Sequence, residues 1–288
     1  MLFQGRKLES SGNSRRYLKH LNLPMQNRID QTFASLRSRR QSGFMAYITG
    51  GDPTLEGTVE VAASLAEAGV DFLEIGVPFS DPLADGEANQ AGAQRALAAG
   101  ATLPKLLRAV SRIRDKCLLP IILYSYLNPL YQYGFERFER DAFEAGVDGL
   151  LLLDLPPDET LLPDNKEKLI HRIRLIAPTT PVTRMKRIVS KASGFVYYVS
   201  REGVTGERAQ LADKISEHVA QIRRETELPI AVGFGISNPE QVALVSKLAD
   251  AVVVGSAIVR RVGRFAADPE LPKRIKEFVQ PLVQAVRR

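Results

Sequence analysis

The amino-acid sequence predicts an α/β fold and, within that class, a closed (β/α)₈ barrel. Short apolar or β-branched runs alternate with longer amphipathic runs from residue 44 onward. A repeated strand–helix unit implies parallel strands joined by right-handed crossovers. Eight such units in roughly 250 residues favour closure into a barrel. The alternative is an open doubly wound sheet, but the chain has no strand-linked G-x-G-x-x-G motif followed by a ribose-binding acid.

Each expected strand is a short run of apolar or β-branched residues, the composition of strands that are buried in a parallel sheet. In chain order these runs are Phe44–Thr49, Phe72–Ile75, Ile121–Tyr124, Gly149–Leu153, Leu175–Ala177, Phe195–Val199, Pro229–Val232 and Ala251–Val254. In such barrels chemistry takes place on the loops that follow the strands, so residues at the carboxyl ends of the strands are the candidates for function.

The longer runs between the strands have the apolar spacing of amphipathic helices. These helices are expected at Leu55–Ala68, Asn89–Ala99, Pro104–Cys117, Phe135–Ala145, Asp158–Ile173, Val182–Ser190, Leu211–Thr226, Pro239–Lys247 and Pro272–Val286, with a short helical turn before the last of them. A further helix at Asn27–Arg39 precedes the first strand. We expect this extra N-terminal helix to pack against the bottom of the barrel.

The composition is that of an ordinary globular protein, with 288 residues, 44% hydrophobic and 25% charged. We expect one barrel domain over residues 25–288, in the cytoplasm, and no stretch approaches the ~18 apolar residues needed to span a bilayer. Residues 1–24 lack periodicity and are expected to be a poorly ordered extension. Part of it resembles a protease-site remnant, Leu2-Phe3-Gln4-Gly5, and its Arg-rich character leaves organelle import open.

The net charge of +6 does not indicate a nucleic-acid partner once the charges are located. Residues 1–40 hold nine Lys and Arg against two Asp and Glu, and the remainder holds 30 against 31. The near-neutral body lacks a basic groove for a phosphate backbone.

Cysteine and histidine give no sign of a metal site. A single cysteine, Cys117, excludes an internal disulfide and fits a reducing compartment. His20, His171 and His218 are not spaced as metal ligands, and we expect all three to be solvated surface residues.

Two carboxylates near the second strand are the strongest candidates for chemistry. Glu74 interrupts an apolar strand, and Asp85 follows on a loop stiffened by Pro and Gly. A lone ionised carboxylate in an apolar core is costly, so Glu74 must be paired, solvated or kept for chemistry. If Glu74 points into the barrel mouth, Gly76 on the same face should leave open space beside it. The pair suits acid–base catalysis; the alternative is that Glu74 pairs with an arginine and that Asp85 is a turn residue.

Glycine-containing loops after strands six, seven and eight form a candidate phosphate site. Backbone N–H groups and a helix N-terminus hold phosphate well, and glycine lets the backbone approach the anion closely. In barrels a phosphate site is frequent after strands seven and eight. The candidates are Thr205, Gly206, Phe234, Gly235, Gly255 and Ser256; the alternative is that these loops are ordinary turns.

Four ordered runs resemble the tryptophan synthase alpha chain family. They are Leu73–Gly86, Tyr197–Gly206, Gly233–Ser237 and Gly255–Val259, and the resemblance extends from about Asn27 to the C-terminus. It implies a phosphate-binding TIM barrel that cleaves indole-3-glycerol phosphate to indole and glyceraldehyde 3-phosphate in tryptophan biosynthesis. Glu74 and Asp85 would be catalytic, and no metal or organic cofactor would be needed. It also implies a tryptophan synthase beta subunit, which uses pyridoxal phosphate, as the partner in an alpha2beta2 assembly.

The resemblance adds residues around the substrate. Tyr126 and Asn128 match a family segment that lines the indole pocket. Tyr197 lies where the family has a neighbour of the catalytic Glu, and its phenol either hydrogen-bonds Glu74 or is a core aromatic. Asp154 is expected to support the site rather than to react.

One segment departs from the family pattern. Glu87-Ala88-Asn89 stands where the family usually has Pro and a β-branched residue. Glu87 adds negative charge that could raise the pKa of Asp85. Loops 76–90 and 203–212 are expected to be lids.

Three alternatives to a beta-dependent synthase subunit stay open. They are a stand-alone indole-3-glycerol phosphate lyase, a low-activity regulatory partner of a beta subunit, and a different phosphate-binding barrel such as a sugar-phosphate isomerase. The last would share the phosphate loops but would not require Glu74 and Asp85.

Overall fold

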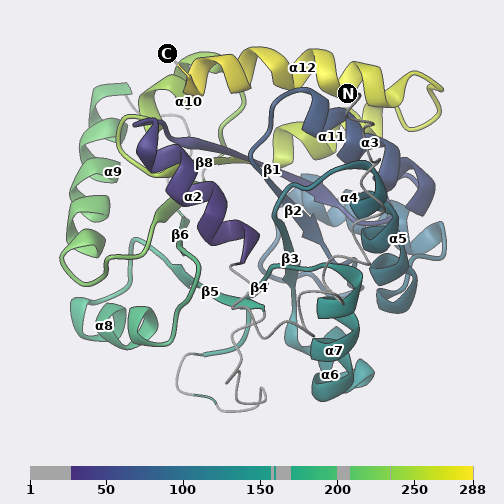
Figure 1. Cartoon of the computed structure of the whole chain (residues 1–288), viewed down its shortest axis with the longest axis horizontal. Helices are drawn as coiled ribbons and strands as arrows, with labels where there is room; N and C mark the ends of the chain where they lie inside the picture. Colours follow the sequence, from purple (N-terminus) through teal and green to yellow (C-terminus); the bar gives the residue numbers. More distant parts are fainter. Residues whose placement is uncertain (1–26, 157–158, 160–169, 200–207, 234, 288) are drawn as a thin grey trace, which may run out of the picture.

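The computed structural model describes residues 27–156, 159, 170–199, 208–233 and 235–287, and in it eight parallel strands close into a barrel (Figure 1). The strands follow one another around the barrel in chain order, and β1 pairs with β8 through registers such as Met45↔Val253. Their bounds are β1 Gly43–Thr49, β2 Phe72–Gly76, β3 Ile121–Ser125, β4 Gly149–Leu152, β5 His171–Ile176, β6 Val196–Val199, β7 Ile230–Gly233 and β8 Ala251–Val254. The predicted fold class and strand order are confirmed.

Helices surround the barrel, and one of them, α2, crosses the end that faces the viewer in Figure 1. The helices are α2 Arg28–Ser38, α3 Leu55–Glu67, α4 Glu87–Ala98, α5 Leu103–Lys116, α6 Leu127–Tyr133, α7 Phe135–Ala145, α8 Val182–Ser190, α9 Arg208–Arg223, α10 Pro239–Val245, α11 Ser256–Arg264 and α12 Leu271–Val286. No helix in the described part of the chain is both long enough and apolar enough to cross a membrane.

Alternation along the strands separates two hydrophobic cores. Leu73 and Ile75 of β2 belong to the large core between the barrel and its helices, whereas Phe72 belongs to the smaller core inside the barrel. Side chains of α2 close this inner core at the bottom, where the ring centroids of Phe33 and Phe72 lie 4.6 Å apart. The expected packing of the N-terminal helix against the bottom of the barrel is therefore confirmed. Phe72 marks the face of β2 that points into the barrel.

The helix expected at Asp158–Ile173 is wrong at its C-terminal end, where residues from His171 onward form β5. Ile173 and Leu175 contribute to the inner core, which leaves Arg172 and Arg174 on the outer face of the strand. Residues 157–158 and 160–169 lie outside the described residues.

The histidines differ from the sequence expectation. His171 is buried, and its Nε2 lies 2.9 Å from Oδ2 of Asp30 on α2. His218 is half-buried and stacks on Tyr198 with ring centroids 5.5 Å apart. The prediction of solvated surface positions is wrong for His171, whose ring helps to fix α2 under the barrel. His20 and the extension at residues 1–24 lie outside the described residues.

A helix that the sequence analysis missed follows β3. Asn128 and Pro129 lie in the first turn of α6, where a proline without an N–H group is tolerated. Asp154 accepts a 2.7 Å hydrogen bond from the N–H of Leu127 and so holds the start of this helix. The contact is structural and supports the helix that carries Asn128.

Candidate active site

Glu74 lies on the inner face of β2, in register with Tyr47 of β1 and Ile122 of β3. Its neighbour two residues earlier, Phe72, is part of the inner core, so the Glu74 side chain also points into the barrel. It is 1% exposed, and neither carboxyl oxygen has a hydrogen-bond partner among the described residues. The arginine pair that was the alternative for Glu74 is absent from this part of the chain. A buried carboxyl without a partner is rare in folded proteins, which singles out Glu74 as a functional group.

Burial changes the protonation state of Glu74. Burial first, and the nearby charge of Asp85 second, raise the pKa of Glu74 to about 8. At neutral pH the side chain is therefore mainly a neutral acid that can donate a proton.

The space beside Glu74 is filled by a tyrosine. A Cβ atom added at Gly76 would lie 2.2 Å from the hydroxyl oxygen of Tyr47, so the missing side chain makes room for this phenol. The prediction of open space at Gly76 is wrong, because the ring of Tyr47 occupies it. Tyr47 also packs edge-on against Tyr124, with ring centroids 5.1 Å apart. Two phenols therefore form a wall next to Glu74.

Asp85 is held by two tyrosines from the end of β3. The phenol of Tyr124 donates to Oδ1 and that of Tyr126 donates to Oδ2, each at 3.0 Å. The hydroxyl oxygen of Tyr126 also accepts a 2.9 Å hydrogen bond from the N–H of Ala84. The amide of Gln90 donates to the carbonyl of Asp85 at 2.8 Å. The loop after β2 is thus tied to β3 and α4 around one carboxylate.

The pKa of Asp85 is raised from its usual value by burial, while hydrogen bonds from Tyr124, Tyr126 and Asn89 oppose that shift. The sequence suggested that Glu87 could raise it; the structure attributes the shift to burial instead. Asn89, in the departing segment, donates to Oδ1 of Asp85 at 3.4 Å. Glu87 and Asn89 both belong to the first turn of α4, so the segment expected as a lid is partly helical.

The other residues predicted to line the pocket differ in burial and in their contacts with the two acids. Tyr197 is buried, but it makes no hydrogen bond with Glu74, whose charge nonetheless contributes to raising the pKa of Tyr197 after burial. Tyr126 is buried and donates a hydrogen bond to Asp85, whereas Asn128 is exposed on α6. Sequence reasoning missed Tyr47 and Tyr124. Each is a tyrosine near the carboxyl end of its strand, β1 or β3, and this position could have indicated a phenol pointing into the site.

The candidate phosphate residues that the structure describes lie at the same end of the barrel. Gly255 is the N-cap of α11, whose first helical residue is Ser256. A Cβ atom at Gly255 would lie 3.2 Å from Cβ of Tyr47, which places this helix start beside the tyrosine wall. Gly235 is exposed and has φ +36, a conformation suited to glycine. Thr205, Gly206 and Phe234 lie outside the described residues.

The N-terminus of α11 suits an anion, because the first N–H groups of a helix have no acceptor within it. Across the described ranges, no group of three or more His, Cys, Asp and Glu side chains is arranged to hold a metal ion.

Comparison with known proteins gives one consistent family. A family model described as tryptophan synthase alpha chain matches residues 33–287. The tryptophan synthase alpha chain of Geobacter sulfurreducens is 47% identical over 264 residues, which cover 90% of this chain and 99% of that protein. The alpha chain of Citrifermentans bemidjiense is 45% identical over 262 residues, covering 90% of this chain and 98% of that protein.

Solved structures agree with the sequence matches. Tryptophan synthase subunit alpha from Legionella pneumophila str. Paris aligns with a TM-score of 0.82 at 36% identity, over 91% of this chain and 99% of that one. A chain of the M. tuberculosis tryptophan synthase aligns with a TM-score of 0.81 at 30% identity, over 91% of this chain and 100% of that one. With both acids at the barrel mouth and these matches along nearly the whole barrel, the chain belongs to the tryptophan synthase alpha chain family.

Proposed function

We propose that Glu74 and Asp85 carry out the retro-aldol cleavage of indole-3-glycerol phosphate, the activity of this family. The observation that carries the proposal is the contrast between the two acids. Glu74 is buried, has no hydrogen-bond partner among the described residues and is mainly protonated near neutral pH, whereas Asp85 is held by two phenols that favour its ionised form. Two carboxyl groups whose environments separate their protonation states are suited to distinct acid and base roles.

Each acid has one part in the reaction. Protonated Glu74 gives its proton to the indole carbon that bears the glycerol chain. Positive charge then spreads to the ring nitrogen, where ionised Asp85 accepts the N–H and stabilises the charge. As the carbon–carbon bond breaks, the adjacent hydroxyl returns a proton to Glu74, and indole and glyceraldehyde 3-phosphate leave. Glu74 ends the reaction protonated, as it began, so the proposed steps need no cofactor.

The phosphate end of the substrate is assigned to the start of α11. Gly255, which precedes Ser256 at the start of α11, lies beside Tyr47, and Gly235 follows β7 at the same rim. We extend this site to Thr205, Gly206 and Phe234 on the basis of the family resemblance. Binding energy at this remote end would align the indole with Glu74 and Asp85. Tyr197, Tyr126 and Asn128 complete the proposed pocket.

Members of the family work with a beta subunit, and we extend this property in three respects. The partner is a pyridoxal phosphate enzyme, the assembly is alpha2beta2, and the location is the cytoplasm. Indole release from indole-3-glycerol phosphate by the purified chain, with and without a beta subunit, tests the function. Slow release that the beta subunit accelerates is the expected result. Fast release by the chain alone would favour a stand-alone lyase, and no release in either case would contradict the proposal.

A further inference from the structure

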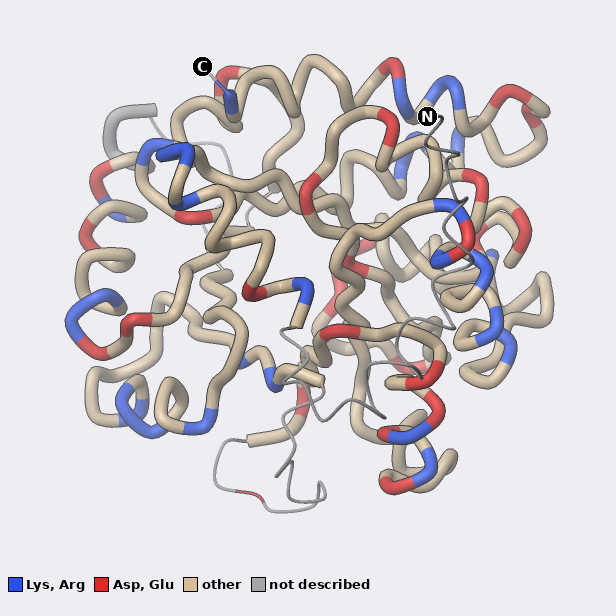
Figure 2. The backbone as a smooth tube through the Cα atoms, in the orientation of Figure 1, with Lys and Arg blue, Asp and Glu red and all other residues tan. Residues whose placement is uncertain are grey.

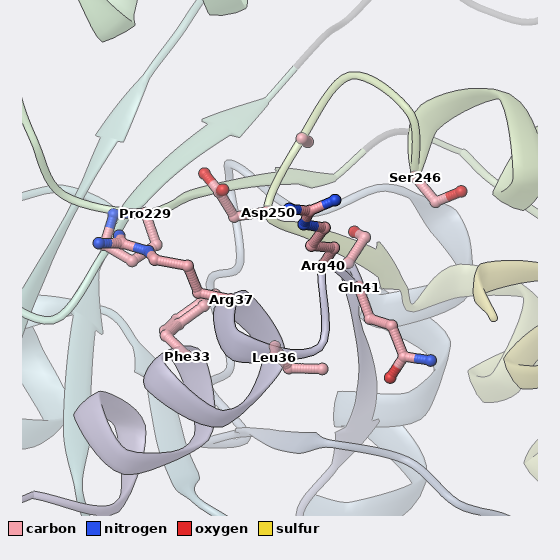
Figure 3. Close-up of a pocket in the computed structure, with 10 residues that line it drawn as sticks. Phe33, Leu36, Arg37, Arg40, Gln41, Pro229, Ser246 and Asp250 are labelled. Atoms are coloured by element: carbon pink, nitrogen blue, oxygen red, sulfur yellow. The ribbon is translucent and has the colours of Figure 1, made fainter.

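A pocket with a volume of about 340 Å³ lies at the bottom of the barrel, at the opposite end from Glu74 (Figure 3). It is bounded by the end of α2 and by residues that directly precede strands β1, β7 and β8, among them Ser42, Pro229 and Asp250. Phe33 and Leu36 give it an apolar side. None of these residues belongs to the proposed catalytic site.

Positive charge gathers in this pocket. Figure 2 shows Lys and Arg at the C-terminal end of α2, and the close-up in Figure 3 shows the side chains of Arg37 and Arg40 extending along the pocket. Within the described part of the chain, neither guanidinium has a carboxylate within ion-pair distance. Asp250 also lines the pocket, but it is already paired with Arg223 at 2.9 Å and accepts the N–H of Ile230 at 2.8 Å. Two guanidinium groups therefore have no ion-pair partner among the described residues.

The pocket wall beside the two arginines is formed by fixed backbone. The carbonyl of Ser42 accepts a 3.1 Å hydrogen bond from Nη1 of Arg287. The hydroxyl of Ser42 is enclosed and does not face the pocket. The charged groups that the pocket offers to a ligand are therefore the two guanidinium groups.

Arg40 occupies a backbone position that favours glycine. Its φ is +54, the left-handed conformation that ends α2, and the next N–H, of Gln41, closes the helix on the carbonyl of Leu36 at 3.0 Å. An L-residue with a side chain is disfavoured in this conformation. The chain thus keeps a guanidinium at a position where glycine would be locally more stable, and that guanidinium reaches the pocket.

From the guanidinium pair and the backbone position of Arg40 we propose that the pocket binds a small phosphate-type oxyanion. Guanidinium groups match the oxygens of phosphate in charge and geometry. Both inorganic phosphate and a phosphate monoester have this chemistry. A monoester would also place its organic part against Phe33 and Leu36.

The test is a titration of the 15N-labelled chain with inorganic phosphate, followed by the backbone amide signals of Gln41, Ser42, Ala249 and Asp250. Signals from the start of α11 report the catalytic end separately in the same spectra. We expect saturable shifts at the lower pocket with a dissociation constant in the millimolar range or below. A parallel titration with phenyl phosphate separates the two sources, because tighter binding than inorganic phosphate identifies an organic monoester, and equal or weaker binding identifies the free ion.

Arg40→Gly separates binding from folding. Glycine suits the left-handed conformation, so this variant should unfold at the same or a higher temperature than the wild type, yet bind phosphate at the lower pocket about tenfold more weakly or worse, as for loss of a charged hydrogen bond. Arg39→Ala is the matched control, because Arg39 ends the same helix but lines a different pocket. It should keep the wild-type affinity. Absence of saturable shifts in the wild type, unchanged affinity in Arg40→Gly, or equal losses in both variants would overturn the proposal.

Discussion

The phenol of Tyr124 donates a 3.0 Å hydrogen bond to Oδ1 of Asp85, and this contact joins the end of β3 to the loop after β2. Tyr126 binds the other carboxylate oxygen at the same distance. Hydrogen bonds to a carboxylate favour its ionised form, and here they oppose the effect of burial. Glu74 has no such donors in the described structure and is mainly protonated at neutral pH. The site thus holds one acid and one base a short stretch of sequence apart.

Replacing Tyr124 with Phe should raise the pKa of Asp85 further and lower kcat about tenfold, since a hydrogen bond to a charged group is lost. The acidic limb of the pH–rate profile should move to higher pH. Tyr133→Phe is the matched control, because it also removes a phenol–carboxylate hydrogen bond, to Asp141, but one that lies between α6 and α7. An unchanged acidic limb in Tyr124→Phe would contradict the role given to this phenol.

The pH dependence of kcat/KM should be bell-shaped. The reaction needs protonated Glu74, so the rate should fall as the pH rises through about 8, the raised pKa of this group. It should also fall at low pH, where Asp85 takes up a proton, and this limb should lie above the usual pKa of an aspartate. Steady-state rates between pH 4 and pH 10 check both limbs. A rate that stays constant through pH 9 would show that Glu74 is not the acid.

Glu74→Gln should be stabilised relative to the wild type as the pH rises. Below pH 4.5, the ordinary pKa of glutamate, the side chain is protonated in both the folded and unfolded states. Between pH 4.5 and about 8 the unfolded chain loses the proton while the folded chain keeps it, so the unfolding free energy of the wild type decreases. The difference between variant and wild type should change by on the order of a few kcal/mol over this window. Urea unfolding at pH 4 and pH 8 measures it, and a pH-independent difference would contradict the raised pKa.

Gly76→Ala should destabilise the barrel mouth and reduce activity. The new methyl group would meet the hydroxyl of Tyr47 at 2.2 Å, so the tyrosine must move, and we expect a loss of about 1–3 kcal/mol. Gly86→Ala is the control for folding, because nothing lies within 4 Å of its added Cβ and its φ of −77 suits alanine. Its unfolding free energy should stay within about 0.5 kcal/mol of the wild type. Thermal unfolding of both variants tests the contrast.

The sequence was most informative where local pattern and tertiary environment agree. Apolar strand composition located seven strands closely, because nearly all their residues are buried, and it found only the C-terminal part of β5. Glu74 was identifiable because a carboxylate in such a strand conflicts with its surroundings. The first turn of α6 could not be predicted from Asn128-Pro129, since the group that holds its start, Asp154, comes from the segment after another strand.

Other features needed information that only the folded chain contains. The alternation of Arg172, Ile173, Arg174 and Leu175 is that of a strand, but the polar residues before it extended the predicted helix through Ile173. The partners of Asp85 come from the next strand, which sequence spacing alone does not pair with this loop. The filling of the space at Gly76 by Tyr47 depends likewise on the register between β1 and β2.

The most direct test of the account is the rate of indole release from indole-3-glycerol phosphate by Glu74→Gln and Asp85→Asn, each assayed with a beta subunit and checked for wild-type folding. Glu74→Gln should release no measurable indole, because an amide can neither donate nor take back the proton. Asp85→Asn should bind the substrate but release indole much more slowly, since the charge on the ring nitrogen is no longer stabilised. Release by folded Glu74→Gln at the wild-type rate would contradict the central claim.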